Sequence, residues 1–198
     1  MTPIFTGILL VDKPAGFTSF DVVAKLRRAC GTKKIGHAGT LDPAATGVLP
    51  VFTGAATKLI PLLEESGKAY QAVIKLGVLT DTLDADGLIL REEKTAVTPE
   101  EFAAVLPVFS GKQLQTPPMF SAVKVNGQRL YSAARRGEEI SVPPREIEII
   151  GLGLDNADEQ RQIFTITCSI ISEWTGTKLT SYILGISLFT DHIIFIAL

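Results

Sequence analysis

KIGHAGTLDPAATGVLPV, residues 34–51, is the stretch around which the rest of the chain is organised. It carries a single carboxylate, Asp42, followed at once by Pro43. Small residues surround this acid, whereas a core element would carry larger side chains and a plain surface loop would carry more charge. Small side chains let a bulky, flat partner come close to the backbone. The stretch therefore predicts a loop with a binding site at its acid.

Asp42 has two interpretations. The more frequent one is a turn residue, because an Asp side chain before proline often forms a hydrogen bond with the backbone two residues further on. The other is a nucleophilic or general-base carboxylate that Pro43 holds rigid. His37 is likewise either a hydrogen-bonded loop histidine or part of the same site. No second His or Cys lies near enough in sequence to indicate zinc, so no metal site is expected.

Four motifs then resemble, in order, those of the TruB family, the bacterial tRNA pseudouridine synthases that act on uridine 55 of the T-loop. They are LLVDKPAGFTSFDVV at 9–23, GHAGTLDPAATGVLPV at 36–51, KAYQAVIKLGVLTDTLDADG at 68–87 and QTPPMFSAVKVNGQRLYSAARRGEEI at 115–140. The resemblance implies a catalytic carboxylate at Asp42. It also implies a substrate-binding set made of Lys13, His37, Gly39, Thr40 and Tyr70.

The resemblance also implies roles for three of these residues. Tyr70 would stack on the target base, although packing within a strand is the commoner role of a strand tyrosine. Lys13, otherwise a solvated loop lysine, would lie close to the active site, where an ammonium can fix a carboxylate or a phosphate. His37 would help displace the flipped nucleotide. Asp42 could attack the ribose at C1′, attack the base at C6, or act as a base toward the sugar; no cofactor is expected.

The pattern of apolar residues predicts an α+β fold, with a mixed, mainly antiparallel sheet and inserted helices. Strands are expected at 7–11 (buried), 68–79, 88–92, 120–125, 146–152 and 163–168. Helices are expected from Phe20 to Gly31, over 55–63, from Thr98 with Phe102, Val105 and Leu106 as its apolar stripe, and over 130–136. An Asn126-Gly127 turn predicts a hairpin. The aspartates of 80–87 lack the glutamate of a calcium loop, which excludes an EF-hand.

A basic cluster stands just before the central loop. Arg27, Arg28, Lys33 and Lys34 supply it, although the formal net charge of the chain is −2. Such a cluster is usually a solvated face; beside an active site it can bind RNA phosphates.

Composition is that of an ordinary globular protein, and a monomer is expected. Cys30 and Cys168 have no metal or redox spacing, so they are interpreted as buried apolar residues of a reducing, cytoplasmic protein. The N-terminus has no basic region of a signal peptide. No apolar run before the last thirty residues is long enough to span a membrane.

The resemblance stops after Ser169. Family members continue with a Lys-Gly-Thr-Tyr-Ile-Arg segment, which supplies a second tyrosine and an arginine that pairs with the catalytic aspartate. Lys178, Thr180 and Tyr182 echo it out of register, and Leu184 stands where the arginine would fall. Residues 1–169 are thus expected to form an incomplete catalytic domain, with 170–198 as an atypical apolar tail from a frameshift, insertion or truncation and no PUA domain.

Rival interpretations remain open. One is an RNA-binding or RNA-remodelling protein that no longer catalyses; another is a frameshifted product that does not fold stably. A metal-dependent hydrolase is disfavoured by too few candidate ligands.

Overall fold

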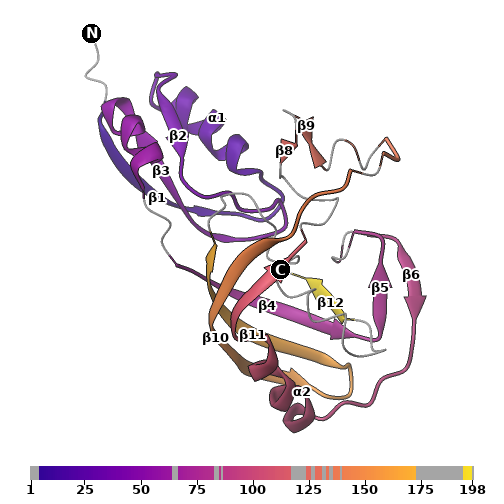
Figure 1. Cartoon of the computed structure of the whole chain (residues 1–198). Coiled ribbons are helices and arrows are strands. Elements are labelled where there is room, and N and C mark those ends of the chain that lie inside the picture. The colour runs from indigo at the N-terminus through magenta and orange to yellow at the C-terminus, as the bar shows by residue number, and fades with distance from the viewer. Residues whose placement is uncertain are drawn as a thin grey trace. The chain divides into compact units, whose positions relative to one another are not determined.

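The computed structural model describes residues 5–63, 67–82, 85, 87–116, 124–125, 128–130, 133, 136–138, 140–172 and 194–197. The chain forms two compact units, Met1–Ser66 and Gly67–Leu198, and each is described by itself (Figure 1). Both contain antiparallel sheets with a few short helices, so the predicted α+β class is confirmed. No helix of the described residues is both long and apolar enough to cross a membrane.

The first unit is built on a three-stranded antiparallel sheet in the order β1-β3-β2. The strands are β1 (Gly7–Lys13), β2 (Ile35–His37) and β3 (Gly47–Thr53). The 3-10 helix η1 (Gly54–Leu62) follows β3 and contacts all three strands. It ends close to Pro61, which cannot donate to a regular helix.

Helix α1 (Ser19–Ala29) follows β1 and precedes β2 in the sequence, and it packs on the sheet. The sequence predicts this helix. Thr18 is its cap, because its hydroxyl accepts from the Asp21 N–H while the Asp21 carboxylate accepts from the Thr18 N–H, a reciprocal capping box. Val22 and Val23 are buried against the sheet. The helix ends at Cys30, before Gly31 with its positive φ of 61°.

Strand β1 is not buried on both faces, which corrects the prediction of a fully buried strand. Leu9 and Val11 face α1 and join the core of the unit, whereas Ile8 and Leu10 point the other way and are 52% and 74% exposed. The alternation follows from the two-residue period of a strand. It also directs Lys13, the next residue in phase with Leu9 and Val11, toward the interior.

The second unit contains a five-stranded antiparallel sheet in the order β12-β4-β11-β10-β7. Its strands are β4 (Lys68–Leu76), β7 (Gly111–Gln115), β10 (Arg145–Asp158), β11 (Ile163–Ser172) and β12 (Ile194–Ala197). Two further pairs are β5 (Val78–Thr80) with β6 (Ile89–Glu92), and β8 (Lys124–Val125) with β9 (Gln128–Arg129), which confirms the hairpin.

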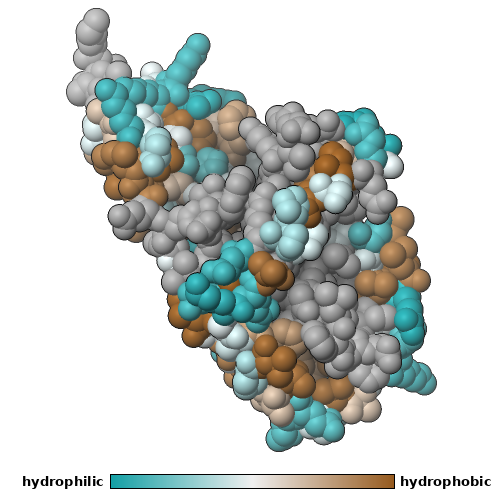
Figure 2. Space-filling model, viewed as in Figure 1, coloured by the Kyte–Doolittle hydropathy of each residue, from teal (hydrophilic) through white to brown (hydrophobic). Residues whose placement is uncertain are grey.

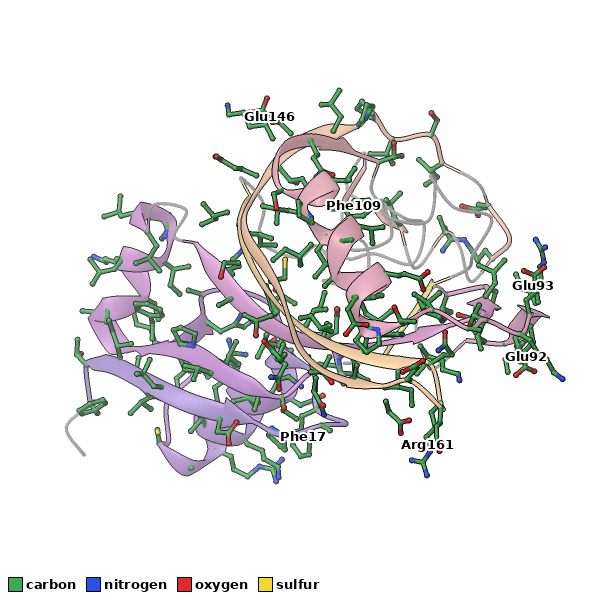
Figure 3. All side chains as sticks on the ribbon, turned by 90° about the horizontal axis from the view of Figure 1, so that it is seen from below. Phe17, Glu92, Glu93, Phe109, Glu146 and Arg161 are labelled. Carbon is green, nitrogen blue, oxygen red and sulfur yellow. The ribbon has the colours of Figure 1, made fainter. Side chains whose placement is uncertain are left out.

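Helix α2 (Pro99–Val105) and the 3-10 helix η2 (Leu106–Phe109) pack on the curved pair β10–β11, and Figure 3 shows Phe109 on this segment. Thr98 caps α2 with Glu101, as the sequence predicts. Phe102 stacks on Phe164 of β11 with ring centroids 4.2 Å apart. Val105, expected in the apolar stripe, is 40% exposed, and Phe109 joins the core with Phe102 and Leu106 instead.

Several boundaries differ from the prediction. The strand expected over 68–79 breaks at Gly77, where φ is 80° and a side chain would meet the Glu93 carbonyl at 2.2 Å. Strands β10 and β11 run longer than expected, and β11 continues to Ser172 with Ile170 fully buried. Strand β7 is not predicted by its sequence. Of the strand expected at 120–125 and the helix at 130–136, most residues lie outside the described ranges.

The two cysteines lie in different environments. Cys168 is fully buried in the core of the second unit, as predicted, whereas Cys30 at the end of α1 is exposed, so that half of the prediction is wrong. Helix α1 turns its valines inward and leaves its C-cap residue, Cys30, at the surface. Burial raises the pKa of the Cys168 thiol to about 11.

We expect iodoacetamide to label one thiol per native molecule at pH 8 and two per molecule in denaturant. The raised pKa alone lowers the Cys168 thiolate fraction about 100-fold relative to an ordinary thiol, and burial blocks the reagent as well. Mass spectrometry of peptides should place the native label on Cys30. Labelling of Cys168 at the rate of Cys30 would show that this core is not packed as described.

Candidate active site

The loop that carries Asp42 spans residues 38–46 and joins β2 to β3. Its first residue is fixed to the sheet, since the Ala38 N–H donates to the Pro50 carbonyl at 3.0 Å. Gly39 follows with a φ of 76°, a conformation that side-chain-bearing residues rarely adopt. A side chain at Gly39 would meet no atom within 4 Å, so the space in front of this residue is open.

Hydrogen bonds brace the loop on both sides of Asp42. Before it, the Ser19 hydroxyl accepts a hydrogen bond from the Leu41 N–H at 3.0 Å and donates one to the Leu41 carbonyl at 3.2 Å. After it, the Gly16 N–H donates to the Pro43 carbonyl at 2.8 Å. The half-buried Asp42 is therefore held through the main chain of both its neighbours, by Gly16 and by Ser19, the first residue of α1.

The main chain at Asp42 also forms a turn, because the Ala45 N–H donates to the Asp42 carbonyl at 3.1 Å. The turn interpretation of the Asp-Pro pair is thus correct for the backbone. It does not exclude a site, since Thr40, Pro43 and Ala44 around the acid are exposed.

Lys13 is 0% exposed, which excludes the interpretation as a solvated loop lysine. Its ammonium donates to the carbonyls of Phe17 at 2.6 Å, Pro14 at 3.0 Å and Pro43 at 3.3 Å. Burial lowers the pKa of Lys13, and the negative charges of Asp42 and Asp21 act in the opposite direction. The Lys13 ammonium therefore lies close enough to the Asp42 carboxylate for the two charges to interact.

His37 is the last residue of β2 and is half-buried. Its Nδ1 lies 2.6 Å from the Gly39 carbonyl. Because a carbonyl can only accept, Nδ1 carries the proton of this bond, which leaves Nε2 as an acceptor when the ring is neutral. The histidine is thus oriented by the same loop whose backbone it holds.

The structure brings five of the six predicted residues together in the first unit: Lys13, His37, Gly39, Thr40 and Asp42. Tyr70 belongs to the second unit, on β4 opposite Cys168, where it is half-buried and packs against the core. Packing against the core therefore explains why part of the Tyr70 ring is buried. Its role in stacking on a base stays a prediction.

Sequence reasoning missed Ser19. A single hydroxyl suffices to cap α1, and Thr18 takes that role with Asp21 three residues later. The second hydroxyl, that of Ser19, is not needed for the cap, and this is the signal that the sequence offers. In the structure Ser19 is 3% exposed, and a buried hydroxyl needs a hydrogen-bond partner.

Ser19→Ala is expected to lower the free energy of unfolding by about 1–3 kcal/mol, because it leaves the Leu41 N–H without its partner. Denaturant unfolding measures this loss, and faster hydrogen exchange at the Leu41 amide should accompany it. Ser110→Ala, at an exposed serine, is the matched control and should change stability by less than about 0.5 kcal/mol. An unchanged exchange rate at the Leu41 amide would show that Ser19 does not hold the Asp42 loop.

Among the described residues, no group of three or more His, Cys, Asp and Glu side chains comes together in a way that could hold a metal ion.

Comparison with known proteins points to a single family. The model of the TruB family pseudouridylate synthase N-terminal domain matches residues 27–171. The tRNA pseudouridine synthase B of Geotalea uraniireducens (strain Rf4) is 52% identical over 164 residues, which is 82% of this chain and 53% of the relative. The same-named protein of Lactococcus lactis subsp. cremoris (strain MG1363) is 50% identical over 151 residues, 75% of this chain and 46% of the relative.

Solved structures agree with the fold. A chain in the crystal structure of a Cbf5-Nop10-Gar1 complex superposes with a TM-score of 0.67, at 25% identity, over 96% of this chain and 48% of that chain. A chain in the structure of an H/ACA RNP bound to a substrate RNA containing 2'-deoxyuridine gives 0.63 at 22% identity, which supports the fold alone.

The chain spans about half the length of the relatives that it matches. The matched region nevertheless includes the whole Asp42 loop and most of the second unit's sheet. This match, together with the identity to the synthases of two bacteria, shows that the chain belongs to the TruB family of pseudouridylate synthases.

Proposed function

We propose that this chain isomerises uridine 55 to pseudouridine in the T-loop of tRNA, with Asp42 as the catalytic carboxylate. The observation that carries the proposal is the bracing of Asp42 at Leu41 and Pro43, on a loop within the family match. A catalytic group must be held close to its productive geometry, and bonds on both sides of the acid supply that order.

The reaction breaks the N1–C1′ glycosidic bond, rotates the uracil and forms a C5–C1′ bond. The hydrogen at C5 leaves to solvent and N1 gains one, so that the product is an isomer and no net oxidation takes place. Asp42 would act as an ionised carboxylate on the ribose C1′, on the base C6 or as a base toward the sugar. In each case the target uridine must leave its stack to reach the acid.

The surrounding residues have roles that suit this chemistry. The open space at Gly39 and the exposed Thr40 admit a flat base to the loop backbone. His37, fixed at Nδ1, would help displace the flipped nucleotide, and Tyr70 would stack on the uracil. Lys13 would hold the loop and favour the charged form of Asp42.

A second candidate is a protein of the same family that binds RNA but does not catalyse the isomerisation. The observation that favours it is the sequence after Ser169, which lacks the Lys-Gly-Thr-Tyr-Ile-Arg segment and has Leu184 where an arginine would pair with the aspartate. On this view residues 1–169 form an incomplete catalytic domain and 170–198 an atypical tail.

Tritium release from 5-labelled uridine in T-loop RNA, measured beside a gel shift, separates the two candidates. Release together with binding supports the synthase. Binding without release supports the second candidate, and neither binding nor release overturns both.

A further inference from the structure

The two units differ in the sign of their net charge. Residues 1–66 contain seven lysines and arginines and five aspartates and glutamates, a net charge of +2. Residues 67–198 contain 12 basic and 16 acidic side chains, a net charge of −4. Such an asymmetry between the halves of a chain points to a polyanionic partner for the basic half.

Five of the seven basic residues of the first unit lie on α1 and in the turn after it, and one of them, Arg27, is half-buried. Four exposed residues lie on the second half of α1 and in the turn that leads to β2; we call them the α1 basic surface, and they are Lys25, Arg28, Lys33 and Lys34. Figure 2 shows hydrophilic surface along this end of the unit, where Figure 1 places α1 and the turn into β2. Lys25 and Arg28 are three residues apart and share a face of the helix.

The turn that carries the two lysines is ordered by hydrogen bonds. The Thr32 N–H donates to the Arg27 carbonyl at 3.2 Å, and the Thr32 hydroxyl accepts from the Lys34 N–H at 3.2 Å. The Lys34 carbonyl in turn accepts from the Gly54 N–H at 2.8 Å. The positions from which these side chains project are therefore fixed by the fold.

No ion pair within the described part of the protein is seen for these four cations, and Lys25 has an aromatic partner, since its ammonium lies 4.5 Å from the centroid of the Phe17 ring. The ion pairs seen in the described residues lie in the second unit: Arg91–Glu93, Lys112–Glu146, Arg136–Glu138 and Arg161–Asp158. Arg27 differs from its neighbours, since its guanidinium donates to the Ile35 carbonyl at 3.0 Å and ties the helix to β2. Arg27 is thus used in the structure of the unit, whereas the four residues of the α1 basic surface are exposed to solvent.

A favourable interaction with the helix dipole explains Arg28 in the last turn of α1. It does not explain Lys33 and Lys34, which stand beyond the helix on a turn. Solvation explains any exposed lysine singly, but not a charge excess confined to the unit that carries Asp42.

We propose that the α1 basic surface binds the phosphate backbone of the RNA substrate. The inference rests on the proposed function, because it takes RNA as the partner of this unit. Each lysine or arginine that neutralises a phosphate releases a counterion, which makes affinity fall steeply with salt. Phosphate contacts position the RNA without reading its sequence, which leaves recognition of the uridine to the Asp42 loop.

The test replaces all four residues of the α1 basic surface with glutamine in the full chain and measures binding of a T-arm RNA hairpin by fluorescence anisotropy over a salt series. We expect the Kd at 100 mM salt to rise at least about 10-fold, and the slope of log K against log salt to fall by about 3. The control changes Arg91, Lys94, Lys112 and Arg161 to glutamine, which removes the same charge from exposed positions of the second unit. It should change neither quantity appreciably.

Wild-type affinity and salt slope in the α1 variant would overturn the proposal, and so would an equal loss in the control. Equal competition by polyglutamate would assign the surface to an acidic protein instead. Should the fourfold variant fail to melt cooperatively, the double variants Lys25→Gln/Arg28→Gln and Lys33→Gln/Lys34→Gln apply the same criterion. Binding needs no turnover: absent tritium release beside cation-dependent binding would refute the synthase while supporting this surface.

Discussion

Asp42→Asn is expected to reduce pseudouridine formation at least about 10³-fold while changing RNA affinity less than about twofold. The amide has nearly the shape of the carboxylate but neither its charge nor its nucleophilicity. The bonds that the main chain of Leu41 and Pro43 makes with Ser19, Gly16 and Lys13 remain available in the variant. The substitution should therefore remove the chemistry and leave the loop in place.

Single-turnover tritium release and a gel shift on the same RNA measure the two quantities. Asp12→Asn is the matched control, because Asp12 is exposed on the opposite face of β1 from Lys13 and its loss changes the net charge equally. It should retain wild-type turnover. Turnover by the Asp42→Asn protein would refute the assignment of the catalytic carboxylate.

Lys13→Met is expected to lower the free energy of unfolding by about 3–5 kcal/mol. Methionine fills a similar volume but cannot donate, so the carbonyls of Pro14, Phe17 and Pro43 lose the ammonium. The loss falls on the contact between the Asp42 loop and the segment after β1, and it also removes a positive charge that acts on Asp42.

Urea unfolding followed by circular dichroism gives the magnitude. Lys94→Met, at an exposed lysine, should change stability by less than about 0.5 kcal/mol. A loss below about 1 kcal/mol in Lys13→Met would mean that solvent replaces the ammonium easily, contrary to its complete burial.

Local patterns predict most elements of the fold because they depend on neighbours in sequence. The capping residues Thr18 and Thr98 mark the starts of α1 and α2, and alternation gives the faces of β4. Strand β7, with the sequence GKQLQ, has too few apolar residues to be recognised, since pairing with β10 stabilises it. Gln162 likewise gives no local signal, yet it is buried with a φ of 53° and bonds both backbone groups of Val97.

The candidate site is predictable where it rests on a contiguous motif and less so where it rests on tertiary contacts. Asp42 and Gly39 share one loop, His37 ends the strand that leads into it, and all three follow from one contiguous motif. Ser19 bonds Leu41 across 22 residues, a contact that no local pattern contains. The interior position of Lys13 follows from its phase with Leu9 and Val11, but a lysine in that phase is ordinarily taken as the end of the strand.

The most direct test of the central claim uses a T-arm RNA in which uridine 55 alone carries tritium at C5, incubated with an excess of the wild-type chain. The account predicts release of the label in a single turnover, with pseudouridine at position 55 in the digested product. Retention of the label by RNA that the protein has bound would contradict it.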